Sequence, residues 1–70
     1  MEKFSLKEKE FIPLCDLLKR VGFCQTGGHA KIVISEGEVK VDGEVELRKR
    51  CKVRLNQEVE YAGQKVKVGA

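Results

Sequence analysis

The sequence predicts an α+β fold: two short helices packed against a small, mostly antiparallel sheet of four to five strands. Three observations support this prediction. Apolar residues recur at helical spacing in residues 14–21 and again in residues 27–36. Apolar and polar residues then alternate in three later runs, 39–47, 58–62 and 65–68. An Asp-Gly pair at 42–43, a strong short-range hairpin signal, divides the first of these runs.

The chain has 70 residues, 41% of them apolar and 36% charged, which is typical of one small globular domain. A domain of this size buries only about 60% of its unfolded surface, so its core must be small. We therefore expect a single domain spanning residues 1–70. No apolar run approaches the roughly 18 residues of a membrane span, and no signal peptide is evident. The sequence predicts a cytoplasmic protein with no membrane contact.

The first predicted helix follows Pro13, a residue that suits a helical first turn because its missing N–H needs no partner there. Gly22 ends this helix. Before it, residues 4–6 are a possible edge strand and residues 7–10 a charged connector. The apolar stripe of the helix consists of Leu14, Cys15, Leu17, Leu18 and Val21.

The second predicted helix begins after Thr26, whose hydroxyl can accept from a backbone N–H of the first turn. Its apolar side comprises Ala30, Ile32, Val33 and Ile34. Gly37 follows the last periodic residue, where a left-handed backbone ends a helix easily.

The strands come next. We expect a type I′ hairpin at Asp42-Gly43 and a type II′ hairpin at Gly63-Gln64. Between them, Cys51, Val53 and Leu55 alternate with basic residues, so that an extended chain would place the basic side chains on one face.

Charge is unevenly distributed. The formal net charge is +3, but residues 48–54 alone carry five basic and no acidic groups. Residues 26–47 carry two basic and five acidic groups. This concentration of positive charge indicates a polyanionic partner more strongly than the net charge does.

Two candidate binding regions follow. The first is the start of the second helix, where unpaired N–H groups and the positive helix end favour an anion. Its candidate residues are Thr26, Gly27, Gly28, His29 and Lys31. An ordinary helix cap explains the same residues equally well. The sequence GxxxxGK[ST] of a nucleotide-binding loop is absent.

The second region is the basic segment, residues 48–54. Its candidate RNA contacts are Arg48, Lys49, Arg50 and Lys52. Arginine binds phosphate through two parallel hydrogen bonds and lysine acts as a point charge. The alternative is a solvated surface with no specific role.

Catalysis and metal binding find no support in the sequence. One histidine in so short a chain supplies no Ser-His-Asp or Cys-His set. The three cysteines, Cys15, Cys24 and Cys51, lack zinc spacing, so we expect no cofactor and no metal. We expect the protein not to be an enzyme.

One run of the sequence comprises Thr26, Ala30, Lys31, Ile34, Gly37 and Val-x-Val-Asp-Gly at 39–43. This run resembles the S-four type RNA-binding domain, which is named for a ribosomal protein. The resemblance covers about residues 11–62. It extends, through Phe4-Ser5-Leu6, residues 14–18 and residues 48–52, to the small stand-alone bacterial YbcJ-like proteins. It implies an alpha-L RNA-binding motif whose RNA surface includes the helix start and the hairpin region. One difference is Gly27, where the family frequently has Arg.

We therefore expect a small monomeric protein that recognises structured RNA by shape and phosphate contacts. The resemblance implies ribosomal or other translation-related RNA, such as transfer RNA. No aromatic stacking platform is evident among the four aromatic residues. The alternatives are a protein–protein adaptor that docks an acidic partner and, less favoured, a protein that binds duplex DNA.

Overall fold

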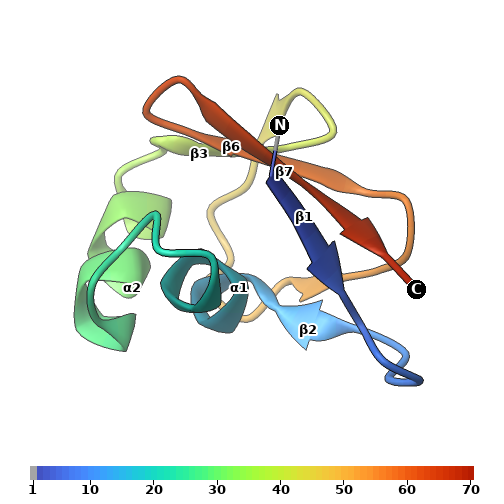
Figure 1. Ribbon diagram of the computed structural model, residues 1–70. Helices are drawn as coiled ribbons and strands as arrows, with labels where there is room; N and C mark the ends of the chain where they lie inside the picture. Colours follow the sequence, from blue (N-terminus) through green and yellow to red (C-terminus); the bar gives the residue numbers. More distant parts are fainter. Residues whose placement is uncertain (1) are drawn as a thin grey trace.

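Two helices lie against one side of a five-stranded sheet in the computed structural model, which describes residues 2–70 (Figure 1). This confirms the predicted fold class. In chain order the elements are β1 (Glu2–Ser5), β2 (Ile12–Pro13), α1 (Leu14–Arg20), α2 (Gly27–Ser35), β3 (Val39–Val41), β4 (Glu44–Val45), β5 (Lys52–Val53), β6 (Glu58–Tyr61) and β7 (Gln64–Gly69).

The main sheet has the strand order β1-β7-β6-β3-β4. Its pairs are antiparallel except β1 with β7, which run parallel from Glu2↔Val66 to Ser5↔Gly69. The predicted strand near residues 4–6 is therefore confirmed as an edge strand. A separate small sheet joins β2 to β5, with Ile12 opposite Val53. This pairing connects the segment before α1 to the basic segment.

The core lies between the helices and the inner face of the sheet. Helix α1 contributes Leu14, Leu17 and Leu18, and α2 contributes Ala30 and Ile34, all with no exposed surface. The sheet contributes buried valines, which are Val39, Val41, Val59, Val66 and Val68. Both predicted helical stripes are thus confirmed except at two positions, since Val21 is half-buried and Ile32 is exposed. No polar or charged side chain is buried among residues 2–70.

Both helices end where the sequence predicted. Gly22 adopts φ +82° after α1, and Gly37 adopts φ +78° after α2, the left-handed conformation that a glycine takes without steric cost. Helix α2 begins with Thr26 as its N-cap, since the Thr26 hydroxyl accepts from the His29 N–H at 3.0 Å.

The hairpin between β3 and β4 is confirmed, because Asp42 (φ +53°) and Gly43 (φ +85°) both adopt the left-handed conformation of a type I′ turn. The prediction of a turn at Gly63-Gln64 was wrong by one residue. The loop is Ala62-Gly63, with φ +52° and +78°, and Tyr61 pairs with Gln64. Glycine occupies the second loop position here as it does in Asp42-Gly43, and this turn type matches the strand twist.

Four apolar residues of the predicted helix stripe and alternating runs are exposed: Ile32, Val45, Leu47 and Leu55. Strand β4 ends at Val45, which is 52% exposed because the turn pairs it with the exposed Lys40. Leu55 is 49% exposed, since the chain turns through Asn56 at φ +71° and the alternation stops. Ile32, expected on the apolar side of α2, is also exposed.

Candidate nucleic-acid interface

The backbone of the basic segment is fixed to the start of α1. The Leu14 N–H donates to the Cys51 carbonyl at 2.9 Å, and the Cys15 N–H donates to the Lys49 carbonyl at 3.1 Å. These carbonyls satisfy helix N–H groups that have no partner within the helix. Val53, fully buried, anchors the segment to the core. The segment is therefore held by its backbone, and its charged side chains remain available.

Four of the five cations of the basic segment are exposed with no acidic partner within 4.0 Å among residues 2–70: Lys49, Arg50, Lys52 and Arg54. Arg48 differs. Its guanidinium donates twice to the Glu46 carboxylate, at 2.9 and 3.2 Å, and its backbone N–H donates to the same group at 2.9 Å. These hydrogen bonds from Arg48 lower the pKa of Glu46 to about 2. Of the five basic groups in residues 48–54, one is therefore neutralised by Glu46, and four remain without an acidic partner in the described part of the chain.

Phe11 lies beside the basic segment, although it is 41 positions from Lys52 in the sequence. The Lys52 ammonium is 5.0 Å from the centre of the Phe11 ring, and the Arg54 guanidinium is 5.8 Å from it. Both distances are within the range of a cation–π interaction. Sequence reasoning missed this contact. It follows from the pairing of β2 with β5, which no local pattern in the sequence predicts.

A shallow groove runs between the β3–β4 hairpin and the basic segment. Acidic and basic groups share it, with Asp42, Glu44 and Glu46 on one side and Arg48, Lys52 and Arg54 on the other. Asp42 connects the hairpin to the end of the basic segment: its carboxylate accepts from the Gln57 amide at 3.1 Å and from the Glu58 N–H at 2.9 Å. The Gln57 side chain accepts from the Arg54 N–H at 2.7 Å. The hairpin turn thus braces the end of the segment.

The start of α2 is open to a ligand. A Cβ added at Gly27 would meet no atom within 4 Å, and one added at Gly28 would approach only the Thr26 hydroxyl, at 3.9 Å. Neither glycine has a positive φ. Packing and backbone conformation therefore do not require glycine here, and the first-turn N–H groups can be approached closely. Lys31 is exposed one turn further on.

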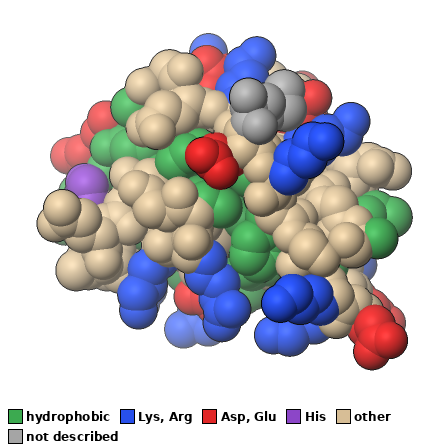
Figure 2. Space-filling view, in the orientation of Figure 1, with side chains coloured by type: hydrophobic (Ala, Val, Ile, Leu, Met, Phe, Trp, Pro, Cys, Tyr) green, Lys and Arg blue, Asp and Glu red, His purple; other side chains and the backbone are tan. Residues whose placement is uncertain are grey.

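His29 lies on the acidic side of the molecule. Figure 2 shows the histidine beside acidic side chains at the left edge. The pKa of Glu38 is raised, mainly by a hydrogen bond with Glu36, and His29 acts in the opposite direction. An imidazole near this acidic pair is a weaker candidate for a phosphate contact than its sequence position suggested.

The two predicted regions lie on either side of α1. In Figure 1 the start of α2 is at the lower left, and β2, which pairs with the basic segment, is at the lower right. Figure 2 shows Lys and Arg side chains gathered along this lower edge. Lys49, Arg50 and Lys52 lie together in one short segment that is tied to α1 and β2, and Thr26, Gly27 and Gly28 form a separate region at the start of α2.

The cysteines are free thiols in the structure, with Cys15 and Cys24 buried and Cys51 half-buried. Burial raises the pKa of Cys24 and of Cys51. Within residues 2–70, no three His, Cys, Asp or Glu side chains are grouped closely enough to hold a metal ion. No helix in that range is sufficiently long and apolar to span a membrane.

The S4 domain family model matches residues 4–69. The chain belongs to the S4 domain family. It is 53% identical to the YbcJ protein of Escherichia coli strain K12 over 70 residues, which covers 100% of both chains. YbcJ of Shigella flexneri has the same identity and coverage.

A solution structure of E. coli YbcJ is similar to the present fold, with a TM-score of 0.78 over 100% of this chain and 89% of that one. That protein is described as containing an alpha-L motif involved in RNA binding. The two helices and hairpin of the present chain share this fold.

Proposed function

We propose that this protein binds structured RNA and holds it by phosphate contacts from the basic segment. The single observation that carries the proposal is the cluster of Lys49, Arg50, Lys52 and Arg54, four exposed cations on a backbone fixed to the start of α1. A fixed backbone keeps the four Cα positions in place, and the exposed side chains can reach phosphates from there. The E. coli relative, with its alpha-L motif, supports the choice of RNA over other polyanions.

Recognition by shape is part of the proposal. The exposed cations form no pattern for reading bases, whereas structured RNA presents phosphates and 2′-hydroxyls that shape-selective proteins contact. The open start of α2 adds a second phosphate contact, through the Gly27 and Gly28 N–H groups. The role is non-catalytic and cytoplasmic, and, by resemblance to the family, translation-associated.

The test is the salt dependence of binding to a blunt RNA hairpin. If four phosphates are neutralised, log K should fall with log salt at a slope of about −3 to −4. The variant Lys49→Gln/Arg50→Gln/Lys52→Gln should flatten this slope by about 2 to 3. These side chains are exposed, so the fold should persist, as circular dichroism would verify.

The matched control is Lys40→Gln/Lys65→Gln/Lys67→Gln. It also removes three exposed cations, here all lysines, but from strands β3 and β7, where they pair in register with Glu58 and Glu60. We expect this control to change the slope by less than about 1. Equal losses in the two variants would mean a diffuse cationic surface without a site. Displacement of the RNA by polyglutamate with equal affinity would favour an acidic protein partner.

A further inference from the structure

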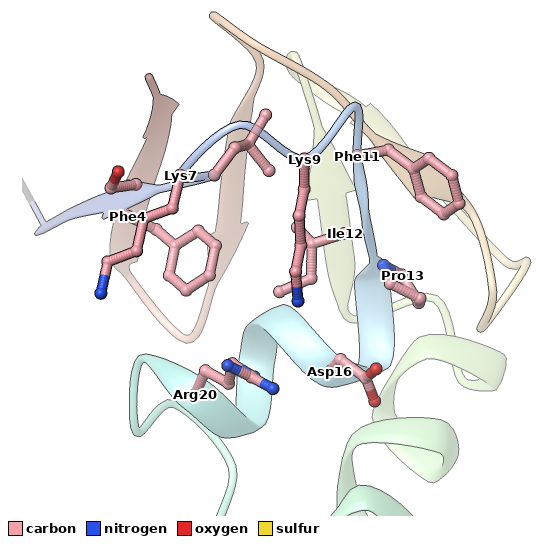
Figure 3. A pocket seen from close by; sticks show the side chains of 10 residues that line it. Phe4, Lys7, Lys9, Phe11, Ile12, Pro13, Asp16 and Arg20 are labelled. Carbon is pink, nitrogen blue, oxygen red and sulfur yellow. The ribbon is translucent and has the colours of Figure 1, made fainter.

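A second cationic site lies outside the regions that the sequence indicated. It is a pocket of about 170 Å³ between β1, the loop that follows it and α1 (Figure 3). We call it the N-terminal pocket. Its apolar floor consists of the buried Leu6 and Ile12 with the half-buried Phe4 ring. The residues that line it are Phe4, Ser5, Leu6, Lys7, Lys9, Phe11, Ile12, Pro13, Asp16 and Arg20.

Three cations surround this floor. In Figure 3 the Lys9 side chain extends across the pocket toward α1, Arg20 reaches toward it from α1, and the Phe4 ring lies between Lys7 and Lys9. All three cations are exposed, and none has an acidic partner within 4.0 Å in the described part of the chain. Asp16 is the one acidic residue of the lining, and its carboxylate points away from Lys9 in this view. The pocket therefore favours an anion.

The loop that carries two of these cations has an unfavourable backbone. Lys7 (φ +50°) and Glu8 (φ +72°) are consecutive left-handed residues, a conformation in which side chains other than those of glycine, Asn and Asp are disfavoured. The turn is closed by the Lys9 N–H, which donates to the Leu6 carbonyl at 3.2 Å. Backbone strain of this kind concentrates at functional sites. Here the turn places both Lys7 and Lys9 in the lining of the same pocket.

Size and chemistry together restrict the ligand. Pockets for drug-sized molecules measure about 300–1,000 Å³, so the N-terminal pocket can enclose one planar group while the rest of a ligand lies at its exposed rim. An aromatic and aliphatic floor suits a planar base, and unpaired lysine and arginine side chains suit a phosphate. One nucleotide supplies both groups.

The pocket adjoins the basic segment through Phe11 and Pro13. Phe11 lines its rim and also lies beneath Lys52 and Arg54. Pro13, another lining residue, pairs with Lys52 across the β2–β5 ladder. An RNA strand held by Lys52 and Arg54 would need to cross only Phe11 to place a nucleotide in the pocket.

We propose that the N-terminal pocket receives one unpaired nucleotide of the bound RNA, with its base against Phe4 and Ile12 and its phosphate among Lys7, Lys9 and Arg20. This proposal rests on the proposed function, since it adds a single-stranded contact to a protein that holds structured RNA by its backbone.

The first test is a titration of the whole protein with uridine 5′-monophosphate, followed by backbone amide NMR. We expect saturable shifts centred on Phe4, Lys9, Ile12 and Arg20. Arg20→Gln should raise the Kd about fivefold or more, because a charge-assisted phosphate contact is lost. Lys19→Gln is the matched control: the neighbouring residue of α1, also exposed, with the same loss of charge but no place in the lining. It should change the Kd less than twofold. On the loop side, Lys9→Gln is compared with Lys3→Gln in the same way.

Three results of this titration would overturn the proposal. The first is the absence of saturable shifts, or shifts confined to residues 48–54. The second is an equal effect of Arg20→Gln and Lys19→Gln. The third is an equal Kd for inorganic phosphate, which would mean that the base contributes nothing.

The second test compares the blunt hairpin with the same hairpin carrying one unpaired 3′ nucleotide. Stacking of one base should make the extended hairpin bind roughly five- to tenfold more tightly. Arg20→Gln should abolish this advantage and leave binding of the blunt hairpin nearly unchanged, whereas Lys19→Gln should preserve it.

The two proposals fail in different ways. If the extended hairpin binds no more tightly than the blunt one, the pocket proposal is overturned. The salt slope of binding to the blunt hairpin still decides the proposed function. If the blunt hairpin does not bind but the nucleotide titrates the pocket, the proposed function is overturned and the pocket stands as a nucleotide site.

Discussion

The basic segment and the start of α2 are both candidate phosphate sites, but they are built in opposite ways. The basic segment uses its backbone internally, since the carbonyls of Lys49 and Cys51 accept from α1, and offers side-chain charge to a ligand. The start of α2 has few charges, and its residues Gly27 and Gly28 have no side chains. It offers backbone N–H groups instead.

This difference means that the two regions should respond to different perturbations. Side-chain charge acts over distances near the Debye length and is screened by salt. Backbone N–H groups act at hydrogen-bond distance, so they depend on close approach and are sensitive to bulk and to added negative charge. Salt should therefore affect mainly the basic segment, and substitution of glycine mainly the start of α2.

The largest effect that separates the two regions is expected from Gly28→Glu. Two like charges about 4 Å apart repel by about 1 kcal/mol even in bulk water, so affinity for the blunt hairpin should fall about fivefold. The fold should become more stable, because glycine within a helix costs about 1 kcal/mol relative to alanine and an acid in the first turn is favourable. A lower affinity with a higher melting temperature would be specific to a ligand contact.

The control is Gly28→Gln, which adds similar bulk without charge. It should lose less affinity than Gly28→Glu if charge repulsion dominates. Unchanged affinity in both variants would mean that Thr26, Gly27 and Gly28 form only an ordinary helix cap.

A smaller effect, of opposite sign, is expected from Glu46→Gln. The carboxylate holds Arg48 in two hydrogen bonds and competes with phosphate for it. Its removal should tighten RNA binding about threefold and steepen the salt slope by up to about 1. Glu44→Gln removes an equal charge two residues away, in β4, at an exposed residue outside that ion pair, and should do less. Equal gains from both variants would mean that only net charge matters.

The same carboxylate predicts a pH dependence. The pKa of Glu46 is lowered from 4.5 to about 2, so the folded state is favoured above the ordinary pKa. This contribution is lost as the pH falls from about 4.5 to 2. It is small, since the Arg48 side chain is 79% exposed. In acid unfolding, the Glu46→Gln variant should lack this pH-dependent contribution to the free energy of unfolding.

Much of the fold could be predicted from local patterns. The stripes of α1 and α2, the Thr26 cap, both glycine stops and the Asp42-Gly43 turn depend on neighbouring residues. The exposure of Val45 was missed, although the sequence implies it. A two-residue loop at 42–43 pairs Val41 with Glu44 and Lys40 with Val45. Opposite residues in an antiparallel pair share a face, so Val45 had to join the exposed Lys40.

The candidate site was predictable only as far as it is continuous in sequence. Lys49, Arg50 and Lys52 form a visible cluster of charge. Phe11 and the N-terminal pocket depend on pairing of β2 with β5 and of β1 with β7, between residues about 40 and 64 positions apart. Such pairings are chosen by packing of the whole core, so no local pattern specifies them. In the sequence, Lys7 and Lys9 consequently resembled part of a charged connector, and Arg20 resembled the end of a helix.

A third substitution sharpens the comparison by making the two regions alike. Gly27→Arg places a cation at the start of α2, at the position where the family frequently has Arg. The site has room, since a Cβ at Gly27 meets no atom within 4 Å. Affinity should rise about two- to threefold and the salt slope should steepen by about 1. An unchanged slope would show that RNA does not approach this end of α2.

The smallest effect on binding is expected from replacing Cys15, Cys24 and Cys51 together by Ala. A thiol must be deprotonated to act as a nucleophile or metal ligand, and burial instead raises the pKa of Cys24 and Cys51. Cys15 and Cys24 are 5% and 1% exposed, so their sulfur atoms contribute packing. The variant should lose about 1 kcal/mol of unfolding free energy for each buried site, measured by urea denaturation. Its RNA affinity and salt slope should equal those of the parent below the new unfolding midpoint, because no cysteine side chain is proposed to contact RNA. A loss of affinity in fully folded protein, or stoichiometric zinc in metal analysis of the parent, would show that the thiols have a role beyond packing.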